Sequence, residues 1–214
     1  MSGLALIRVP KTATVIITIV TAACWLLAEL LDPGGRVDVI MGVIPARLSG
    51  LLDIPAAVPA WLTPLTATLV HGGMLHVALN LLMLVWCGTQ VERILGPGPM
   101  LLLYVVGAYT AAIAQWLVAP LSPTPMIGAS GAISAVIGAF ALSFGQQKRI
   151  VKSASLNRSL NALWLLAAWI VLQVMTGLLA GIQGFLLATP AHIGGFIAGL
   201  LMQRPLLLWR YRNA

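Results

Sequence analysis

The stretch Gly128-Ala129-Ser130-Gly131 opens a run of apolar residues that continues to residue 145. Small neighbours surround Ser130, so another chain can come close to the backbone there. Further along the sequence, His192 opens a second apolar run that continues to residue 209. A serine and a histidine therefore stand at matching positions, each at the start of a long apolar segment.

The composition indicates a membrane protein. Of the 214 residues, 60% are hydrophobic and only 8% are charged, which is too few charges to cover a water-soluble globule. The apolar runs have lengths near the ~20 residues that a helix needs to cross a bilayer. They do not alternate with a period of two, which argues against a membrane barrel, and helices are the remaining way to satisfy the backbone in lipid. We expect an all-α polytopic membrane protein.

The net charge of +7 does not indicate a nucleic-acid partner, because the basic residues lie between the apolar runs and at the chain ends, where they set topology. Cys24 and Cys87 lie within apolar runs without CxxC spacing, and we expect buried, inert thiols. Arg8 and Lys11 precede the first run as in a signal peptide, but no small-residue cleavage site follows. We expect this run to be a retained span.

Proline, glycine and charged residues divide the apolar sequence into six segments. The predicted transmembrane helices lie near residues 13–31, 74–95, 99–118, 128–145, 160–180 and 190–209. No internal repeat, low-complexity tail or linker marks a second domain, so residues 1–214 are expected to form a single membrane domain, a six-helix bundle.

An even number of spans places both chain ends on one side. If that side is the cytoplasm, only Arg36 and Arg47 of the 12 basic residues lie outside, as the positive-inside rule requires. The second, fourth and sixth spans then begin at the outer face, with His76, Ser130 and His192 near their starts. We expect a bacterial inner-membrane protein with cytoplasmic termini and a site that opens to the outer face.

Residues 32–73 form the longest connection, and prolines interrupt its apolar stretches too often for it to span the bilayer. We expect this segment to lie in the outer interface, with Trp61 at headgroup depth. The alternative is an ordinary connecting loop.

Ser130 and His192 are the candidate catalytic residues. Serine is a weak nucleophile until a base removes its proton, and histidine titrates near neutral pH. Below each of them, small residues recur on the same helix face, namely Ser134 and Gly138 below Ser130, and Gly195 and Gly199 below His192. Such faces allow membrane helices to pack closely. Because both helices run in the same direction, this packing would bring Ser130 and His192 together.

A third polar group opens the second span. His76 and Asn80 stand four residues apart and share a helix face, where their N–H groups can stabilise an oxyanion. The helix start at Ser130 adds free backbone N–H groups for the same purpose. For Asn80 the alternative is a capping or interhelical hydrogen bond. For His71 we expect an interfacial histidine without a function.

The same residues allow other interpretations. Ser130 could simply bond back to its own helix, whereas a histidine at membrane depth needs a cavity or a partner. Three histidines invite a zinc site, but no HExxH motif is present. None of the five acidic residues is expected beside His192, so a Ser–His dyad remains in place of a triad. We expect no metal and no cofactor.

These residues resemble the rhomboid family of intramembrane serine proteases, in the six-span form common in bacteria. The resemblance covers about residues 66–200 and rests on four ordered motifs. They are His71-Gly72-Gly73-Met74-Leu75-His76 followed by Asn80, then Val91-Glu92-Arg93, then Gly128-Ala129-Ser130-Gly131, and finally Ala191-His192-Ile193-Gly194-Gly195 with Gly199.

The resemblance implies roles for individual residues. Ser130 would be the nucleophile and His192 the base, and the oxyanion site would be formed by His76, Asn80 and the backbone N–H groups of Gly128 and Ala129. Two features differ from the family. Ser134 stands where an aromatic residue commonly stacks on the catalytic histidine, and Trp61-Leu62-Thr63 stands near the place of a Trp-Arg pair.

We therefore expect an intramembrane serine endopeptidase that cleaves transmembrane segments of other proteins. The substrate would enter near the second and fifth spans and unwind at small or helix-breaking residues, and the glycines between residues 177 and 190 would form a movable cap. The alternatives are a catalytically inactive relative that binds transmembrane helices, and a small transporter whose histidines relay protons. The sequence identifies neither the substrate nor the oligomeric state.

Overall fold

The computed structural model describes residues 12–32, 34–145, 151–182 and 188–212. Within these residues the regular structure is helical, apart from one isolated bridge between Val43 and Met126. The predicted all-α membrane fold is confirmed. The cap predicted between residues 177 and 190 includes residues 183–187, which lie outside the described part.

Six helical passes build the bundle. They are α1 (Ala13–Leu31), the continuous run of α5 (Met74–Met83), η3 (Leu84–Gly88) and α6 (Thr89–Leu95), then α7 (Pro97–Val118), α8 (Ser130–Phe144), α9 (Ala154–Ile182) and α10 (Thr189–Arg210). The η3 segment is a π-helical turn inside the second pass. Five of the six passes contain a stretch long and apolar enough to cross a membrane, and α8 is the shorter one.

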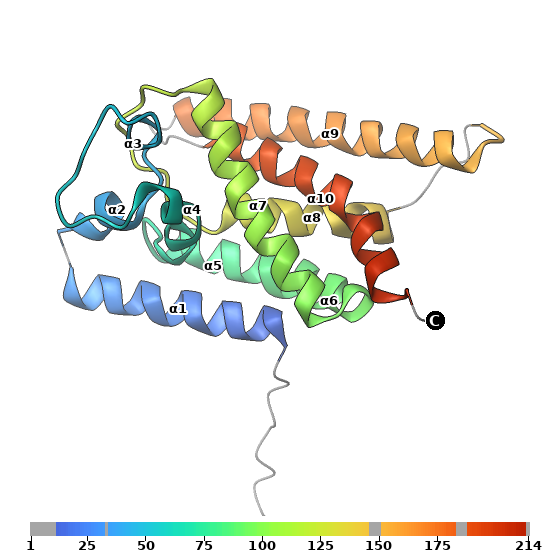
Figure 1. The fold of residues 1–214 in the computed structure, drawn as a ribbon, viewed down its shortest axis with the longest axis horizontal. Helices are drawn as coiled ribbons and strands as arrows, with labels where there is room; N and C mark the ends of the chain where they lie inside the picture. Colours follow the sequence, from blue (N-terminus) through green and yellow to red (C-terminus); the bar gives the residue numbers. More distant parts are fainter. Residues whose placement is uncertain (1–11, 33, 146–150, 183–187, 213–214) are drawn as a thin grey trace, which may run out of the picture.

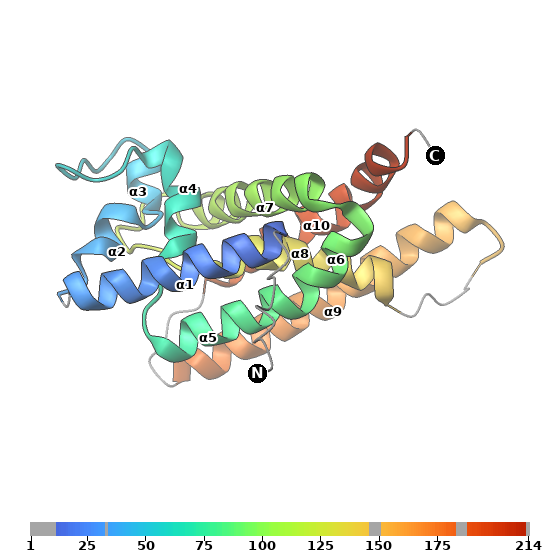
Figure 2. The same cartoon turned by 90° about the horizontal axis from the view of Figure 1, so that it is seen from below.

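The short helix α8 lies at the centre of the bundle. In Figure 1, α7 and α10 cross over it, while α1 and α9 run along opposite edges. In the turned view of Figure 2, α1 passes in front of α8, with α7 above and α9 below. Nine of its 15 residues are buried. At 1.5 Å per residue, 15 residues span about 22 Å, less than the ~30 Å of a hydrocarbon core. One end of α8 must therefore lie within the membrane.

Most helix ends agree with the prediction to within two residues, and α9 is the exception. It begins at Ala154, ahead of the predicted 160. The fourth helix begins at Ser130 in place of residue 128, because Gly128 has a φ of +109°, which a helix does not allow. The third begins at Pro97, since proline suits the first position of a helix.

Glycines bring the backbones of α8 and α10 into direct contact. A Cβ atom on Gly195 would overlap the carbonyl oxygen of Gly131, and one on Gly199 would overlap the carbonyl oxygen of Ala135. In the opposite direction, a Cβ atom on Gly138 would lie 2.5 Å from the carbonyl oxygen of Phe196. The small faces predicted on the two helices therefore do pack against each other. At this separation Cα–H groups can contact carbonyl oxygens, which is common where membrane helices pack closely.

The helix α7 completes this tightly packed group. A Cβ atom on Gly194 of α10 would lie 2.7 Å from the carbonyl oxygen of Thr110, and one on Gly107 of α7 would lie 2.6 Å from Cβ of Ala135. The three helices α7, α8 and α10 thus meet through small residues, and their mutual positions leave little freedom.

The segment 32–73 is more regular than a connecting loop. It contains α2 (Arg36–Met41), α3 (Pro45–Leu48), η1 (Ala60–Leu62), α4 (Thr63–Thr66) and η2 (Ala67–Leu69). These short helices gather at one end of the bundle (Figure 1). The prolines that made this segment too broken to span also start its short helices, with Pro45 and Pro64 in their first turns. Trp61 is 67% exposed, and its place at headgroup depth stays a prediction.

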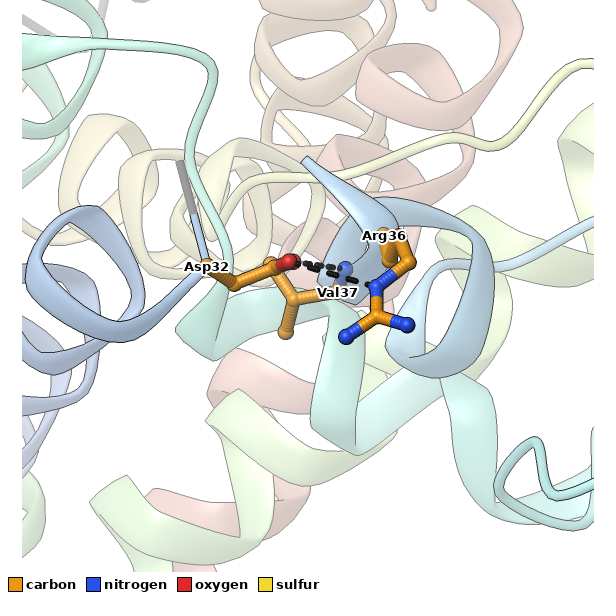
Figure 3. A network of polar contacts seen from close by, with 3 residues as sticks. All are labelled: Asp32, Arg36 and Val37. Atoms are coloured by element: carbon orange, nitrogen blue, oxygen red, sulfur yellow. Dashed lines mark hydrogen bonds and ion pairs between the residues drawn. The ribbon is translucent and has the colours of Figure 1, made fainter. Parts of the chain in front are cut away.

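Asp32 shapes the turn that leaves α1. One carboxylate oxygen accepts a hydrogen bond of 2.6 Å from the N–H of Val37 in the first turn of α2. The other lies 3.6 Å from Nε of Arg36 (Figure 3). Because the Arg36 side chain is 86% exposed, the ion pair adds little stability, and the cap on the helix start is the more important contact.

The start of α1 and the end of α10 meet α6 at the same end of the bundle. The buried carboxylate of Glu92 accepts hydrogen bonds from the N–H groups of Ala13 and Thr14 at 2.7 and 2.8 Å, and from Oγ1 of Thr14 at 2.5 Å. At the other terminus, the hydroxyl of Tyr211 donates to the carbonyl of Ile94 at 3.1 Å. The two ends of the described chain therefore lie together, as six passes require.

Removing the Glu92 cap should destabilise the bundle. The Glu92→Gln variant keeps one acceptor but loses the charge, and we expect it to lower the free energy of unfolding by about 1–3 kcal/mol. The measurement is unfolding by SDS titration in detergent micelles. Glu29→Gln is the matched control, because Glu29 is exposed near the far end of α1. Equal stability of the two variants would contradict this role of Glu92.

Adding a methyl group at Gly195 should force α8 and α10 apart. Overpacking of this kind costs about 1–3 kcal/mol, and we expect Gly195→Ala to unfold earlier in the same titration. Gly98→Ala is the control, since a Cβ atom at Gly98 meets nothing within 4 Å. If Gly195→Ala were as stable as Gly98→Ala, the two helices would not be in direct backbone contact.

Candidate active site

Ser130 and His192 lie within hydrogen-bonding distance of each other. Ser130 is the first residue of α8, and His192 lies in the first turn of α10. Oγ of Ser130 is 2.7 Å from Nε2 of His192. The histidine is only 8% exposed. A serine hydroxyl that donates to an imidazole nitrogen is the arrangement a histidine base needs to remove the serine proton.

A serine that bonds to its own helix is present, but it is not Ser130. Oγ of Ser134 donates to the carbonyl of Ser130 at 2.8 Å. Ser134 is buried, and its Cβ atom lies 3.2 Å from the position that a Cβ atom on Gly195 would take. The small residue at 134 therefore lets α10 approach α8 directly, where the resemblance implied an aromatic ring.

Trp169 of α9 fixes the backbone of His192, and the sequence did not point to it. Its Nε1–H donates to the carbonyl of His192 at 3.3 Å. Its ring stacks on Phe196, one turn below His192, with ring centroids 4.8 Å apart and an interplanar angle of 9°. No local signal marks a tryptophan inside an apolar span as a contact of the candidate site, because only the packing of α9 on α10 brings it there.

His76 packs directly on Gly128, two residues before Ser130. A Cβ atom on Gly128 would lie 2.7 Å from Nε2 of His76 and 3.9 Å from Oγ of Ser130. The other nitrogen of His76, Nδ1, accepts a hydrogen bond from the N–H of Gly72 at 3.4 Å. This assigns the proton of a neutral His76 to Nε2, the atom that faces the site.

Asn80 lies one turn further along the same face. Its Nδ2 donates to the carbonyl of His76 at 2.9 Å, and the side chain is buried. The hydrogen bond within the helix, which was the alternative for Asn80, is therefore present. An amide carries two N–H groups, so the second remains for another acceptor.

The two backbone amides predicted for the oxyanion site make other hydrogen bonds. The N–H of Gly128 donates to the carbonyl of Ala67 at 2.9 Å, and the N–H of Ala129 donates to Nε2 of His71 at 3.3 Å. Their role as oxyanion donors stays a prediction that requires these bonds to open. The N–H groups of the first helical turn, beginning with Ser130, have no partner within the helix by geometry.

His71 differs from the interfacial histidine expected from the sequence. It is 5% exposed, and its ring contacts that of His76 edge-on, with centroids 4.9 Å apart. Burial, and to a smaller extent the neighbouring His76, lower the pKa of His71 to about 4. His71 is therefore neutral at physiological pH. No sequence signal separated it from the other histidines except its place at the start of the motif.

A small cavity adjoins Ser130. It has a volume of about 20 Å³, room for about one water molecule. Its lining consists mostly of alanine, glycine and other small side chains, among them Ala67, Ala108, Ala111, Gly131 and Ala191. In the described part of the chain, no three His, Cys, Asp or Glu side chains are grouped as a metal site.

The profile of the Rhomboid domain family matches residues 59–209, which include every residue of this site. This chain belongs to the rhomboid family. The resemblance inferred from the four sequence motifs is thereby confirmed.

Several curated rhomboid proteins are similar to this chain. Rhomboid protease GluP of Bacillus subtilis is 32% identical over 140 residues, which are 65% of this chain and 25% of that protein. Rhomboid protease GlpG of Pectobacterium atrosepticum is 32% identical over 137 residues, 63% of this chain and 44% of that protein. RHOMBOID-like protein 4 of Arabidopsis thaliana is 28% identical over 145 residues, 67% of this chain and 34% of that protein.

The match therefore spans between a quarter and just under half of these relatives. Two of them carry the name rhomboid protease.

Proposed function

We propose that this rhomboid is an intramembrane serine endopeptidase in which Ser130 is the nucleophile and His192 is the general base. The observation that carries the proposal is the 2.7 Å contact between Oγ of Ser130 and Nε2 of His192. The site lies at the start of a helix too short to span the bilayer, and a peptide bond of a membrane-embedded segment is the substrate that fits this depth.

The reaction follows from the two side chains. Nε2 of His192 takes the proton from Oγ of Ser130 as this oxygen attacks the carbonyl carbon of the substrate. The imidazolium then gives this proton to the leaving amine, and the peptide bond breaks to leave an acyl ester on Ser130. A water molecule, activated by His192 in the same way, hydrolyses the ester and regenerates the free hydroxyl.

The oxyanion formed during attack needs hydrogen-bond donors. The candidate donors are Nε2–H of His76, which lies beside Gly128, the second N–H of Asn80, and the backbone N–H of Ser130 at the start of α8. Preorganised donors of this kind typically contribute 10²–10³-fold each to the rate. The backbone N–H groups of Gly128 and Ala129 could donate to the oxyanion only after their hydrogen bonds to Ala67 and His71 have opened.

The substrate is a transmembrane segment of another membrane protein. A peptide bond inside a helix is shielded, and its carbonyl is already hydrogen-bonded, so the segment must unwind before Ser130 can reach it. We propose entry near α5 and α9, with both termini of the enzyme in the cytoplasm of a bacterium. The site then opens through the end of the bundle that carries the 32–73 segment, towards the outer face.

The test of the dyad is labelling by a fluorophosphonate probe, with the adduct located by mass spectrometry. We expect wild-type protein in detergent to be labelled at Ser130 and Ser130→Ala to be unlabelled. In His192→Ala the labelling rate should fall at least about 100-fold, the usual contribution of a general base.

Ser134→Ala is the matched control, because Ser134 lies one turn further on the same helix and bonds to its own backbone. It should be labelled at nearly the wild-type rate. If folded wild-type protein were not labelled, the proposed protease function would be wrong, and a catalytically inactive protein that binds transmembrane helices would be favoured.

The cavity beside Ser130 predicts which peptide bonds are cleaved. Its volume of about 20 Å³ and its lining of small residues leave no room for a large side chain. We expect substrates with alanine, glycine or serine before the cleaved bond to react at least about tenfold faster than those with leucine or phenylalanine, because overpacking costs more than 1 kcal/mol. The measurement is cleavage of a series of reconstituted transmembrane substrates that differ at this residue. Equal rates across the series would contradict this placement of the substrate.

A further inference from the structure

The turn before Ser130 depends on contacts from outside its own helix. Ala129 is the N-cap residue of α8, and its methyl side chain cannot accept a hydrogen bond from the backbone of the helix. Its own N–H lies outside the helix and needs an acceptor, because an unpaired buried amide is costly. Nε2 of His71 is that acceptor, at 3.3 Å.

Two consecutive amides of this turn are held by residues four positions apart in the chain. The carbonyl of Ala67 accepts from the N–H of Gly128 at 2.9 Å, and His71 accepts from the next N–H, that of Ala129. Ala67 belongs to η2, and His71 follows it closely in the chain. The segment from Ala67 to His71 therefore clamps the turn that sets the direction of the Ser130 side chain.

His71 must be neutral to accept this hydrogen bond. An imidazole accepts a hydrogen bond only through a nitrogen that carries no proton, so the charged form could not hold the Ala129 amide. Burial keeps the pKa of His71 near 4, which leaves the ring neutral where the Ser–His pair would work. The ring is also confined, since it is 5% exposed and rests edge-on against His76.

Space filling does not account for this histidine. Its Nδ1 atom is buried and makes no hydrogen bond of good geometry within the described residues, and the backbone of Leu69 is only a weak partner for the ring. A buried donor without a well-aligned acceptor is costly, a penalty that an apolar side chain of similar size would avoid. The contact with Ala129 is the interaction that an apolar side chain could not replace.

We propose that His71 is a positioning residue, which holds the backbone of Gly128 and Ala129 so that Oγ of Ser130 points at His192. This inference rests on the proposed role of Ser130 as the nucleophile. It adds a third histidine to the site, one that touches neither the substrate nor the reacting atoms.

The test compares two substitutions at position 71. His71→Leu removes the acceptor and keeps an apolar side chain, whereas the carbonyl oxygen of Gln in His71→Gln can take the place of Nε2. We expect fluorophosphonate labelling of Ser130 to slow about tenfold in His71→Leu, because the hydrogen bond from the N–H of Ala129 is lost. In His71→Gln the labelling rate should stay within about threefold of wild type. The rate is expressed per folded molecule, measured by SDS titration.

Thr66→Val is the matched control for a general loss of stability in the same segment. Thr66 donates a hydrogen bond of 2.7 Å to the carbonyl of Met41, away from Ser130. This variant should unfold earlier and be labelled at the wild-type rate. His71 would have no positioning role if His71→Leu were labelled as fast as Thr66→Val, or if Gln failed to rescue the rate.

A second readout separates this proposal from the proposed protease. Hydrogen exchange of the peptide that contains Gly128, Ala129 and Ser130 needs no activity. Exchange should quicken in His71→Leu and stay slow in His71→Gln, even if wild-type protein took up no probe. If wild-type protein took up no probe, only the proposed protease function would be contradicted. If exchange in His71→Leu equalled that of wild type, only the positioning role of His71 would be contradicted.

Discussion

The direct contact between the backbones of α8 and α10 is the constraint on which the site depends. The carbonyl oxygens of Gly131 and Ala135 occupy the space that side chains at Gly195 and Gly199 would fill. Two parallel helices held this closely bring their first turns together, and these turns carry Ser130 and His192. A larger residue on either face would separate the helices and lengthen the 2.7 Å contact between the two side chains.

The second constraint comes from the short length of α8. The first turn of α8 is buried, with Ala129 fully covered, so its backbone amides are away from water and each must find a partner. The 32–73 segment, which includes Ala67 and His71, supplies these partners. Val43 pairs with Met126 through two backbone hydrogen bonds, and Ala67 and His71 hold the next amides. The connection that looked like an interfacial loop is therefore the support of the chain that enters α8.

Much of this fold and part of its site could be predicted from residues 13–209 alone. The apolar runs gave the helices to within a few residues, and the small faces below Ser130 and His192 predicted how α8 and α10 meet. The contacts of Glu92, Trp169 and His71 could not be predicted. Glu92 bonds to residues 78 and 79 positions away, and Trp169 to a carbonyl 23 positions away. No local pattern encodes such partners.

The sequence by itself determined the helices, their number and the pairing of the serine and histidine helices, because apolar length and the spacing of small residues are properties of short stretches. Only the tertiary structure decided which donors and acceptors surround Ser130. The amides of Gly128 and Ala129 looked free in the sequence, yet both are bonded, since a helix start inside a bundle takes its partners from whatever chain packs against it. Here that chain is the segment from Ala67 to His71. The fold brings His71 to the turn before Ser130, although His71 and Ala129 are 58 positions apart in the sequence.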